Sequence, residues 1–300
     1  MTTLRIATFN VENLFARYRF KEGFQPTADD GFTINDTAFR IHNDESKKIT
    51  AKAIREVNAD VLCLQEVESL PVLDRFNSFY LGGMKYAYRA VIDSFDPRAI
   101  DVAVLSRYPI SALRSHREER NKANTAFLFS RDCLEVDILI DGKTLTLYLN
   151  HFKSMMGGRD ETRARRVAQA ERVAAIVDAR WEKSGYKGNF IVLGDFNDYP
   201  QDQTSLSALL DHKGLANVLT RLPKAEQWTH YYAGGNSYSQ LDYLLLSAGL
   251  AKANAGSPAV MRLGLPWRAQ KVTAKRLDGV GDNEPKASDH AALFMDIALI

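Results

Sequence analysis

The amino-acid sequence predicts a layered α/β sandwich, and three observations support this fold class. Many short apolar segments of strand length run through the chain, whereas only two long helical segments are evident. The chain can form a sizeable core, because 45% of its 300 residues are hydrophobic. It contains no internal repeat, low-complexity tract or Pro/Ser-rich linker. We therefore expect sheets covered by helices, an α/β (α+β) architecture, in a single domain over residues 1–300.

The predicted strands are short apolar runs bounded by polar or turn-forming residues. In the first run, Leu4 and Ile6 fall on one face and Ala7 and Phe9 on the other, with the period of two that a strand requires. The runs are Leu4–Asn10, Val61–Gln65, Ala87–Ile92, Val102–Ser106, Thr125–Phe129, Cys133–Ile140, Leu145–Asn150, Phe190–Leu193, Leu241–Leu246 and Ala291–Ile297.

Two segments have the apolar spacing of amphipathic helices. Ser46 is a suitable N-cap for a helix that has Ile49, Ala53 and Val57 on its inner face. A second helix is expected from about Asp160 to Trp181, with acidic residues in its first turn, where they interact favourably with the helix dipole.

Three long polar segments match neither pattern: Ala16–Glu45, Arg107–Asn124 and Ala251–Ala287. Long loops in a compact domain are often functional. We expect these segments to frame a substrate groove.

Composition limits the cellular and redox setting. No stretch approaches the roughly 20 apolar residues of a membrane span. The first ten residues alternate like a strand rather than forming a signal peptide, so the cytoplasm is the default expectation, with secretion open if a leader has been trimmed. Cys63 and Cys133 form neither a zinc motif nor a disulfide framework, and we interpret them as small buried hydrophobes.

Charge is informative only locally, since the formal net charge is +2. Residues 151–172 carry six Lys/Arg and three Asp/Glu, a net of 6 − 3 = +3, and residues 261–277 carry five Lys/Arg and no acid. Basic segments suit a polyanionic substrate. On charge alone, however, solvated faces are the better interpretation.

Polar clusters stand where the apolar runs begin or end, and this is the most informative pattern in the chain. If the strands belong to packed sheets, these ends can converge on one cleft. The clusters are Asn10, Gln65-Glu66, Asn150-His151 with Lys153, Asp195 with Asn197-Asp198, Gln240 with Asp242, and Ser288-Asp289-His290.

The side chains in these clusters suit hydrolysis of a phosphodiester. Oxygen donors without cysteine favour Mg²⁺, Mn²⁺ or Ca²⁺ over a structural zinc. Histidines can donate to phosphate oxygens or move protons near neutral pH. A carboxylate next to an amide, as in Asp195 and Asn197, can orient a water.

Six short motifs in order resemble the endonuclease/exonuclease/phosphatase superfamily, which has the deoxyribonuclease-I-like fold. Each motif is weak alone, but six in order over residues 8–290 are specific. They are Thr8-Phe9-Asn10-Val11, Leu64-Gln65-Glu66-Val67, Asn150-His151-Phe152-Lys153-Ser154, Gly194-Asp195-Phe196-Asn197-Asp198, Leu241-Asp242-Tyr243 and Ser288-Asp289-His290.

The resemblance implies a four-layered α/β/β/α sandwich of two mixed sheets flanked by helices, with the site at one end. It implies that Glu66 is the principal metal ligand, with Asn10 supporting metal or phosphate and Asp289 as an additional ligand. Asp195 and Asn197 would orient and activate the water. The resemblance also implies two catalytic histidines: His290 would contact the phosphate with Asp242 as its orienting carboxylate, and His151 would be the second.

Several positions keep two interpretations. Asp101 is either an acid partner for His151 or an aspartate at a strand edge. Lys153 and Arg166 are candidate phosphate contacts, although such cations are more often solvated. His42, His116, His212 and His230 have no partner motif and are expected to be structural or on the surface. The aromatic group Trp228, Tyr231 and Tyr232 either packs in the core or stacks a base, and packing is favoured.

The motifs leave the substrate open. Asn150–Ser154, followed by Arg165–Ala170, resembles a bacterial secreted-type nuclease branch, as does Ile100–Arg107. Members of that branch often carry cysteines where this chain has Met155–Gly158, which loosens the tie to DNA. We expect a metal-dependent endonuclease on nucleic acid, with DNA as the first candidate, and no obligate protein partner. The alternatives are a phosphatase or phosphodiesterase on a small phosphorylated molecule or lipid headgroup, and a catalytically dead binding protein.

Overall fold

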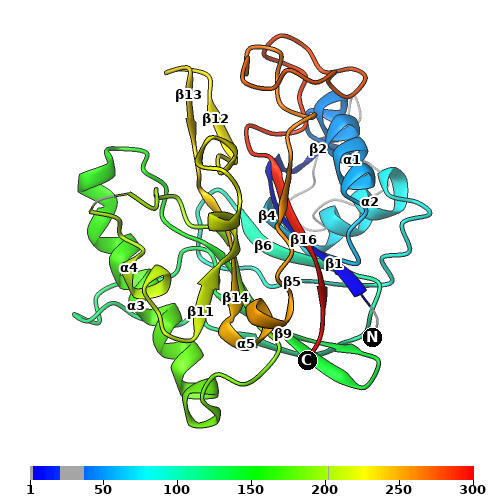
Figure 1. Cartoon of the computed structure of the whole chain (residues 1–300). Coiled ribbons are helices and arrows are strands. Elements are labelled where there is room, and N and C mark those ends of the chain that lie inside the picture. Colours follow the sequence, from blue (N-terminus) through cyan, green and yellow to red (C-terminus); the bar gives the residue numbers. More distant parts are fainter. Residues whose placement is uncertain (1–2, 21–36, 202) are drawn as a thin grey trace, which may run out of the picture.

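The computed structural model describes residues 3–201 and 203–300 except for residues 21–36. It confirms the four-layered sandwich: two mixed six-stranded sheets pack face to face, with α1 and α2 on one side and α3 and α4 on the other (Figure 1). The helices are α1 (Asp44–Val57), α2 (Leu70–Tyr80), α3 (Arg159–Trp181), α4 (Ser207–Leu210) and α5 (Ala248–Ala253), with 3-10 turns at Glu182–Ser184, Val218–Arg221 and Lys224–Glu226.

The first sheet has the order β15-β16-β1-β4-β6-β5 and the second has the order β11-β14-β10-β9-β8-β7. The strands of the first are β1 (Thr3–Leu14), β4 (Val61–Val67), β5 (Tyr88–Val91), β6 (Asp101–Ser106), β15 (Ala259–Met261) and β16 (Ala292–Ala298). Those of the second are β7 (Ile110–Ser115), β8 (Leu134–Ile140), β9 (Lys143–His151), β10 (Phe190–Asp195), β11 (Leu215–Asn217) and β14 (Asp242–Ser247). Two hairpins complete the fold: β2 (Ala16–Phe20) with β3 (Thr37–Ile41), and β12 (His230–Tyr232) with β13 (Ser237–Ser239).

Three apolar cores hold the four layers together. The central core lies between the sheets, where Leu4 and Ile6 of β1 belong to the same buried cluster as Leu193 of β10. On the other face of β1, Ala7 and Phe9 pack with the helices α1 and α2. The outer core of the second sheet packs against α3. The predicted division of the first strand into two faces is therefore confirmed. Both faces are apolar because the sheet is covered on both sides.

The prediction that the two cysteines are small buried hydrophobes is confirmed. Cys63 lies in the core between the sheets, and Cys133 lies in the outer core under α3. Both side chains are free thiols. Burial raises the pKa of each thiol, which keeps them protonated and unreactive.

One predicted strand and one predicted helix cap are wrong. Residues Thr125–Phe129 form a loop rather than a strand, because the side chain of Asn121 accepts the backbone N–H of Thr125 and competes with a ladder. Ser46 lies inside α1, which begins at Asp44. Its hydroxyl instead donates to Glu284 at 3.1 Å and joins the helix to the C-terminal segment.

The three polar segments are more structured than expected. They do not frame the catalytic cavity described below, but Lys271 of the last segment lines a second hollow beside it. Residues 107–124 contain β7, and residues 251–287 contain β15 and the end of α5. Residues 16–45 contain the hairpin β2–β3, and residues 21–36 lie outside the described part of the chain. None of the described residues of these segments lines the cavity. No helix within the described residues is long and apolar enough to cross a membrane.

Candidate active site

Strand pairing in the first sheet brings polar residues to one end of the sandwich. The parallel strands β1 and β4 pair Asn10 with Gln65, so that Glu66 follows beside Asn10. Because β16 runs antiparallel to β1, His290, which precedes β16, reaches the same end. Gln65 itself is buried and bonds to Thr8, so its amide supports the strands rather than the site.

Strand pairing in the second sheet brings three further candidates to that end. β9 and β10 are parallel and β14 is antiparallel, which aligns Asp195 with both His151 and Asp242. The glycine before Asp195 is required by close packing: at Gly194 (φ 132°) a Cβ would lie 1.9 Å from the carbonyl oxygen of Asn150.

Asp195 lies at the centre of the site. Its Oδ1 accepts the backbone N–H of Asn197 at 2.9 Å, and its Oδ2 accepts the side-chain amides of Asn197 and Asn10, both at 3.1 Å. Asn197 occupies the left-handed region (φ 52°), which asparagine tolerates, and its amide also donates to the carbonyl of Phe152. Burial raises the pKa of Asp195 to about 7. The result is a fixed carboxyl group that can exchange a proton near neutral pH.

His290 forms a charged pair with Asp242. Its Nδ1 lies 2.8 Å from Oδ2 of Asp242, and its Nε2 lies 3.7 Å from Oδ2 of Asp195. Thr229 fixes the strand start, because its hydroxyl accepts the backbone N–H of Asp242 at 3.1 Å. Burial alone would lower the pKa of His290, but the carboxylates of Asp242 and Asp195 outweigh it and raise that pKa well above its usual value. His290 is therefore a protonated donor whose Nε2 faces the site.

His151 has the opposite character. Its Nε2 lies 3.5 Å from Oδ2 of Asp195 and 3.9 Å from Oε1 of Glu66. Burial and nearby cations lower its pKa well below the usual value, so it is neutral. The suggested partnership with Asp101 is not formed, because Asp101 accepts both the backbone N–H and the hydroxyl of Ser94, and Nδ1 of His151 is buried without a hydrogen-bond partner.

Glu66 is held by a tight turn that follows Asn10. Its Oε2 accepts the backbone N–H of Asn13 at 3.0 Å, and its Oε1 lies 3.5 Å from the amide of Asn10. Both Glu12 (φ 47°) and Asn13 (φ 63°) adopt the left-handed conformation. The buried ammonium of Lys47 stabilises this turn by donating to the carbonyl of Glu12 at 2.7 Å.

His230 belongs to the site, contrary to its expected structural or surface role. A β-bridge joins it to His290, and the two ring centroids lie 4.6 Å apart. Its Nε2 lies 3.7 Å from Oδ2 of Asp289. The expectation failed because no motif marks the three-residue strand β12, and only the fold brings it beside His290.

These side chains surround one cavity of 540 Å³. Glu12, Glu66, Asp195 and Asp289 give it carboxylates, and the described lining contains no cysteine. Within the part of the chain that the structure describes, two groups of three side chains have ligand atoms close enough for one cation: His230, Asp289 and His290, and Asp195, Asp242 and His290. The donor chemistry therefore fits a divalent cation that prefers oxygen and imidazole ligands.

The cavity also has cationic and apolar side chains on its wall, of which only Tyr232 had been singled out from the sequence. Arg98 and Arg159 line it, and Nε of Arg159 donates to Oδ1 of Asp198 at 2.7 Å. Met156 and Tyr232 lie on the lining with 77% and 59% of their surface exposed. Of the predicted aromatic group, Trp228 and Tyr231 pack in a core, and only Tyr232 reaches the cavity.

The two predicted phosphate contacts lie elsewhere. Arg166 is completely buried, and its guanidinium donates to the hydroxyl of Thr162 at 2.6 Å and the carbonyl of Arg159 at 2.7 Å. It therefore supports the loop before α3 and cannot reach a phosphate. Lys153 is half-buried and is not part of the cavity lining. Its backbone N–H donates to the side-chain oxygen of Gln169.

A four-layered sandwich with carboxylates, amides and histidines at one end of its sheets defines the class of deoxyribonuclease-I-like hydrolases of phosphoric esters. The chain belongs to the Endonuclease/Exonuclease/phosphatase family, whose sequence profile matches residues 5–262. No curated protein matches the chain significantly in sequence. The resemblance to one nuclease branch stays a prediction.

Solved structures share the fold at low identity. Sphingomyelinase C from Streptomyces griseocarneus is 17% identical, with a TM-score of 0.62 and coverage of 99% of this chain and 100% of that one. D. rerio TDP2 complexed with single strand DNA product is 15% identical, with a TM-score of 0.60 and coverage of 99% and 100%. The human Nocturnin catalytic domain with bound sulfate anion is 16% identical, with a TM-score of 0.59 and coverage of 99% and 95%.

Proposed function

We propose that this chain is a divalent-metal-dependent phosphodiesterase that hydrolyses nucleic acid, with DNA as the first candidate. The observation that carries the proposal is the position of Asp195, 3.5 Å from His151 and 3.7 Å from His290, in a cavity that Glu66 also lines. A proton acceptor, a charged donor and oxygen ligands thus lie around one space large enough for a phosphodiester group.

Glu66 would hold the metal ion, with Asn10 and Asp289 supplying further oxygen atoms. When bound, the ion stabilises the negative charge that develops on the phosphoryl oxygens. The side chain of Glu66 is 15% exposed and is oriented by the backbone of Asn13, which supports a ligand that is open to the cavity but fixed in direction.

Asp195 would orient the attacking water and accept its proton. Asn197 and Asn10 fix the carboxylate, so that little reorganisation is needed when the water attacks phosphorus in line with the leaving oxygen. The raised pKa of Asp195, about 7, suits proton transfer near neutral pH.

The contrast between the two histidines supports separate roles. His290, with its raised pKa, would donate to the phosphate and supply a proton to the leaving oxygen. His151, which burial keeps neutral, would bond the attacking water or a phosphate oxygen through Nε2. Groups whose environments push their pKa values apart are typical of acid and base pairs in enzymes.

Two arginines on the cavity wall support an anionic polymer as substrate. The side chain of Arg98 is half-exposed and that of Arg159 is partly exposed. The guanidinium carbon of Arg159 lies 5.2 Å from the centre of the Tyr199 ring. Both can contact phosphates on either side of the scissile bond. The similar structure of TDP2 was solved with a single-stranded DNA product, which makes DNA the first polymer to test.

A second candidate is a phosphodiesterase on a lipid headgroup or another small phosphorylated molecule. The exposed Met156 and Tyr232 on the cavity lining favour it, since an apolar rim can contact lipid. Similarity to sphingomyelinase C makes sphingomyelin the first lipid to test.

A turnover panel separates these functions. We expect nicking of supercoiled plasmid or cleavage of oligonucleotides with Mg²⁺ or Mn²⁺, and none in EDTA. Release of phosphocholine from sphingomyelin, or of inorganic phosphate from inositol phosphates, without nucleic-acid cleavage would favour the second candidate. Binding without turnover of any ester, under every metal tested, would contradict both and indicate a binding protein.

A further inference from the structure

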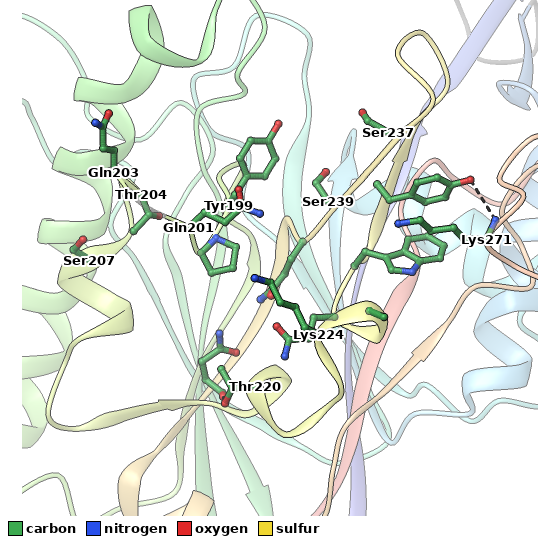
Figure 2. Close-up of a pocket in the computed structure, with 17 residues that line it drawn as sticks. Tyr199, Gln201, Gln203, Thr204, Ser207, Thr220, Lys224, Ser237, Ser239 and Lys271 are labelled. Atoms are coloured by element: carbon green, nitrogen blue, oxygen red, sulfur yellow. Dashed lines mark hydrogen bonds between the residues drawn. The ribbon is translucent and has the colours of Figure 1, made fainter.

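A second hollow, which we call the side groove, adjoins the catalytic cavity. It has a volume of 960 Å³ and is lined by side chains from residues 199–201, 203–207, 217–228 and 237–240 together with Lys271. Tyr199, Ser237 and Ser239 line both spaces, so the groove lies directly beside the cavity. Figure 2 shows Tyr199, Lys224 and Ser239 among the side chains around the side groove.

The side groove differs chemically from the catalytic cavity. None of its described lining residues is Asp or Glu, whereas four carboxylates line the cavity. Lys224 and Lys271 lie on its wall and are exposed, among amide and hydroxyl side chains. Such a surface does not favour a cation, but it does favour a ligand that combines negative charge with hydrogen-bonding groups.

One buried amide in the groove lacks a partner. Gln240 is 6% exposed, and its Nε2 is buried without a hydrogen bond. Its backbone is fixed, because the hydroxyl of Thr229 accepts the next two backbone N–H groups, those of Leu241 and Asp242, both at 3.1 Å. A buried donor without a partner destabilises the free protein, so an acceptor brought by a ligand would bind favourably there.

Aromatic rings supply faces for stacking. Tyr199 is partly exposed, and Tyr238 packs edge-to-face with Trp228 at a centroid separation of 4.9 Å. The ammonium of Lys271 lies 4.5 Å from the centre of the Tyr238 ring, and its backbone N–H donates to the Tyr238 hydroxyl at 3.3 Å, the dashed line in Figure 2. Rings next to lysines are typical of grooves that hold unpaired bases and their phosphates.

We propose that the side groove binds the nucleotides that flank the scissile phosphate of a single-stranded nucleic acid. The proposal rests on the proposed function and adds the strand form. Gln240 would donate to a base or phosphate oxygen, Lys224 and Lys271 would pair with phosphates, and Tyr199 would stack a base. A space of 960 Å³ accommodates a few unpaired nucleotides but not a duplex, and a base inside a duplex could not reach a buried amide.

Binding without turnover tests the groove directly. Fluorescein-labelled oligothymidylates of two to twelve residues are titrated with the full chain in EDTA, and anisotropy is measured at several salt concentrations. We expect Gln240→Ala to raise Kd for the hexamer about 10-fold. Lys224→Ala and Lys271→Ala should each reduce the salt slope by about 0.7. Lys213→Ala, at an exposed lysine paired with Glu182, is the matched control and should change neither. Absence of binding by the wild type, or an unchanged Kd and salt slope in all three groove variants, would overturn the proposal.

Turnover separates failure of the groove from failure of the proposed function. With Mn²⁺, kcat/KM is measured for the oligonucleotide and for bis(p-nitrophenyl) phosphate, which fits the catalytic cavity alone. Each groove variant should lose at least about 10-fold more activity on the oligonucleotide than on the small diester. Equal losses on both would refute the groove while leaving the phosphodiesterase intact. A wild type that is inactive on both esters would refute the proposed function instead. The anisotropy titrations alone would then decide whether the groove binds single strands.

Discussion

The Nδ1 atom of His290, which precedes β16 of the first sheet, lies 2.8 Å from the Oδ2 atom of Asp242, the first residue of β14 in the second sheet. Asp242 is fully buried, and its other oxygen has no hydrogen-bond partner, so its charge is directed almost entirely at the imidazole. This contact fixes the orientation of the protonated imidazole of His290 and keeps Nε2 pointed towards Asp195. The same relationship predicts how the enzyme should respond to pH.

Asp242→Asn should lower activity and move its pH dependence. Removing the carboxylate removes the interaction that raises the pKa of His290, so the imidazole should lose its proton at a lower pH. The alkaline limb of kcat/KM should therefore shift to lower pH, and kcat at pH 7 should fall roughly 10²- to 10⁴-fold. Profiles at saturating Mn²⁺ measure both effects. Asp211→Asn, at an exposed acid, is the control, and an alkaline limb that stays in place in Asp242→Asn would exclude His290 as the protonated donor.

Glu66→Gln should remove metal-dependent turnover with little loss of fold. The substitution keeps the size of the side chain but removes the charge that would hold the cation, at an expected cost of about 3 kcal/mol, or more than about 100-fold in rate. Turnover is measured against Mg²⁺ and Mn²⁺ concentration, and the Tm is measured in parallel. Glu68→Gln, two residues further on, provides a matched control. Wild-type metal dependence in Glu66→Gln would indicate that the cation binds at one of the two histidine-containing groups rather than at Glu66.

Lys47→Met should destabilise the turn that orients Glu66. The Lys47 ammonium donates to the carbonyls of Val11 and Glu12 at 2.5 and 2.7 Å, and the methionine would leave both without that donor. We expect a loss of about 2–4 kcal/mol in the free energy of unfolding and a raised metal requirement. Lys48→Met is the control, because Lys48 is half-exposed and its ion pairs are on the surface. Equal effects of the two substitutions in denaturant titrations would show that the turn does not depend on Lys47.

Much of the fold was predictable because both sheets are covered on each face, which gives their strands near-continuous apolar runs. The helix α2 was missed: it is short, has Pro71 in its first turn, and buries only Val72, Leu73 and Phe76. The edge strand β7 was also missed, since most of its residues are partly or fully exposed and its sequence resembles a polar loop. Strands that bury little apolar surface carry little periodicity to detect.

The candidate site was predictable where a side chain stands at the end of a central strand. Asn10, Glu66, His151 and Asp195 meet because parallel neighbours end at the same edge of a sheet. Arg98 and Arg159 escaped prediction because they line the cavity from segments between strands, whose approach to the site depends on the whole fold. The burial of Arg166 escaped prediction for the same reason. Its charge alone gives no indication that the guanidinium lies among main-chain carbonyls.

Arg166→Met should reduce stability without weakening contacts to phosphate. The guanidinium bonds Thr162 and the carbonyls of Lys153 and Arg159, and its Nε lies 3.9 Å from Oδ2 of Asp198. Removing one partner of a buried charged network costs roughly 3–5 kcal/mol, which should appear as a clear fall in Tm. Oligonucleotide binding, measured well below that Tm, should keep the wild-type salt slope, because no phosphate contact is lost. A slope reduced by about 0.7–0.9, the change expected for one lost contact, would restore Arg166 as a phosphate ligand. Arg163→Met, at a half-buried arginine of the same helix that bonds the carbonyl of Gln203, should change both quantities far less.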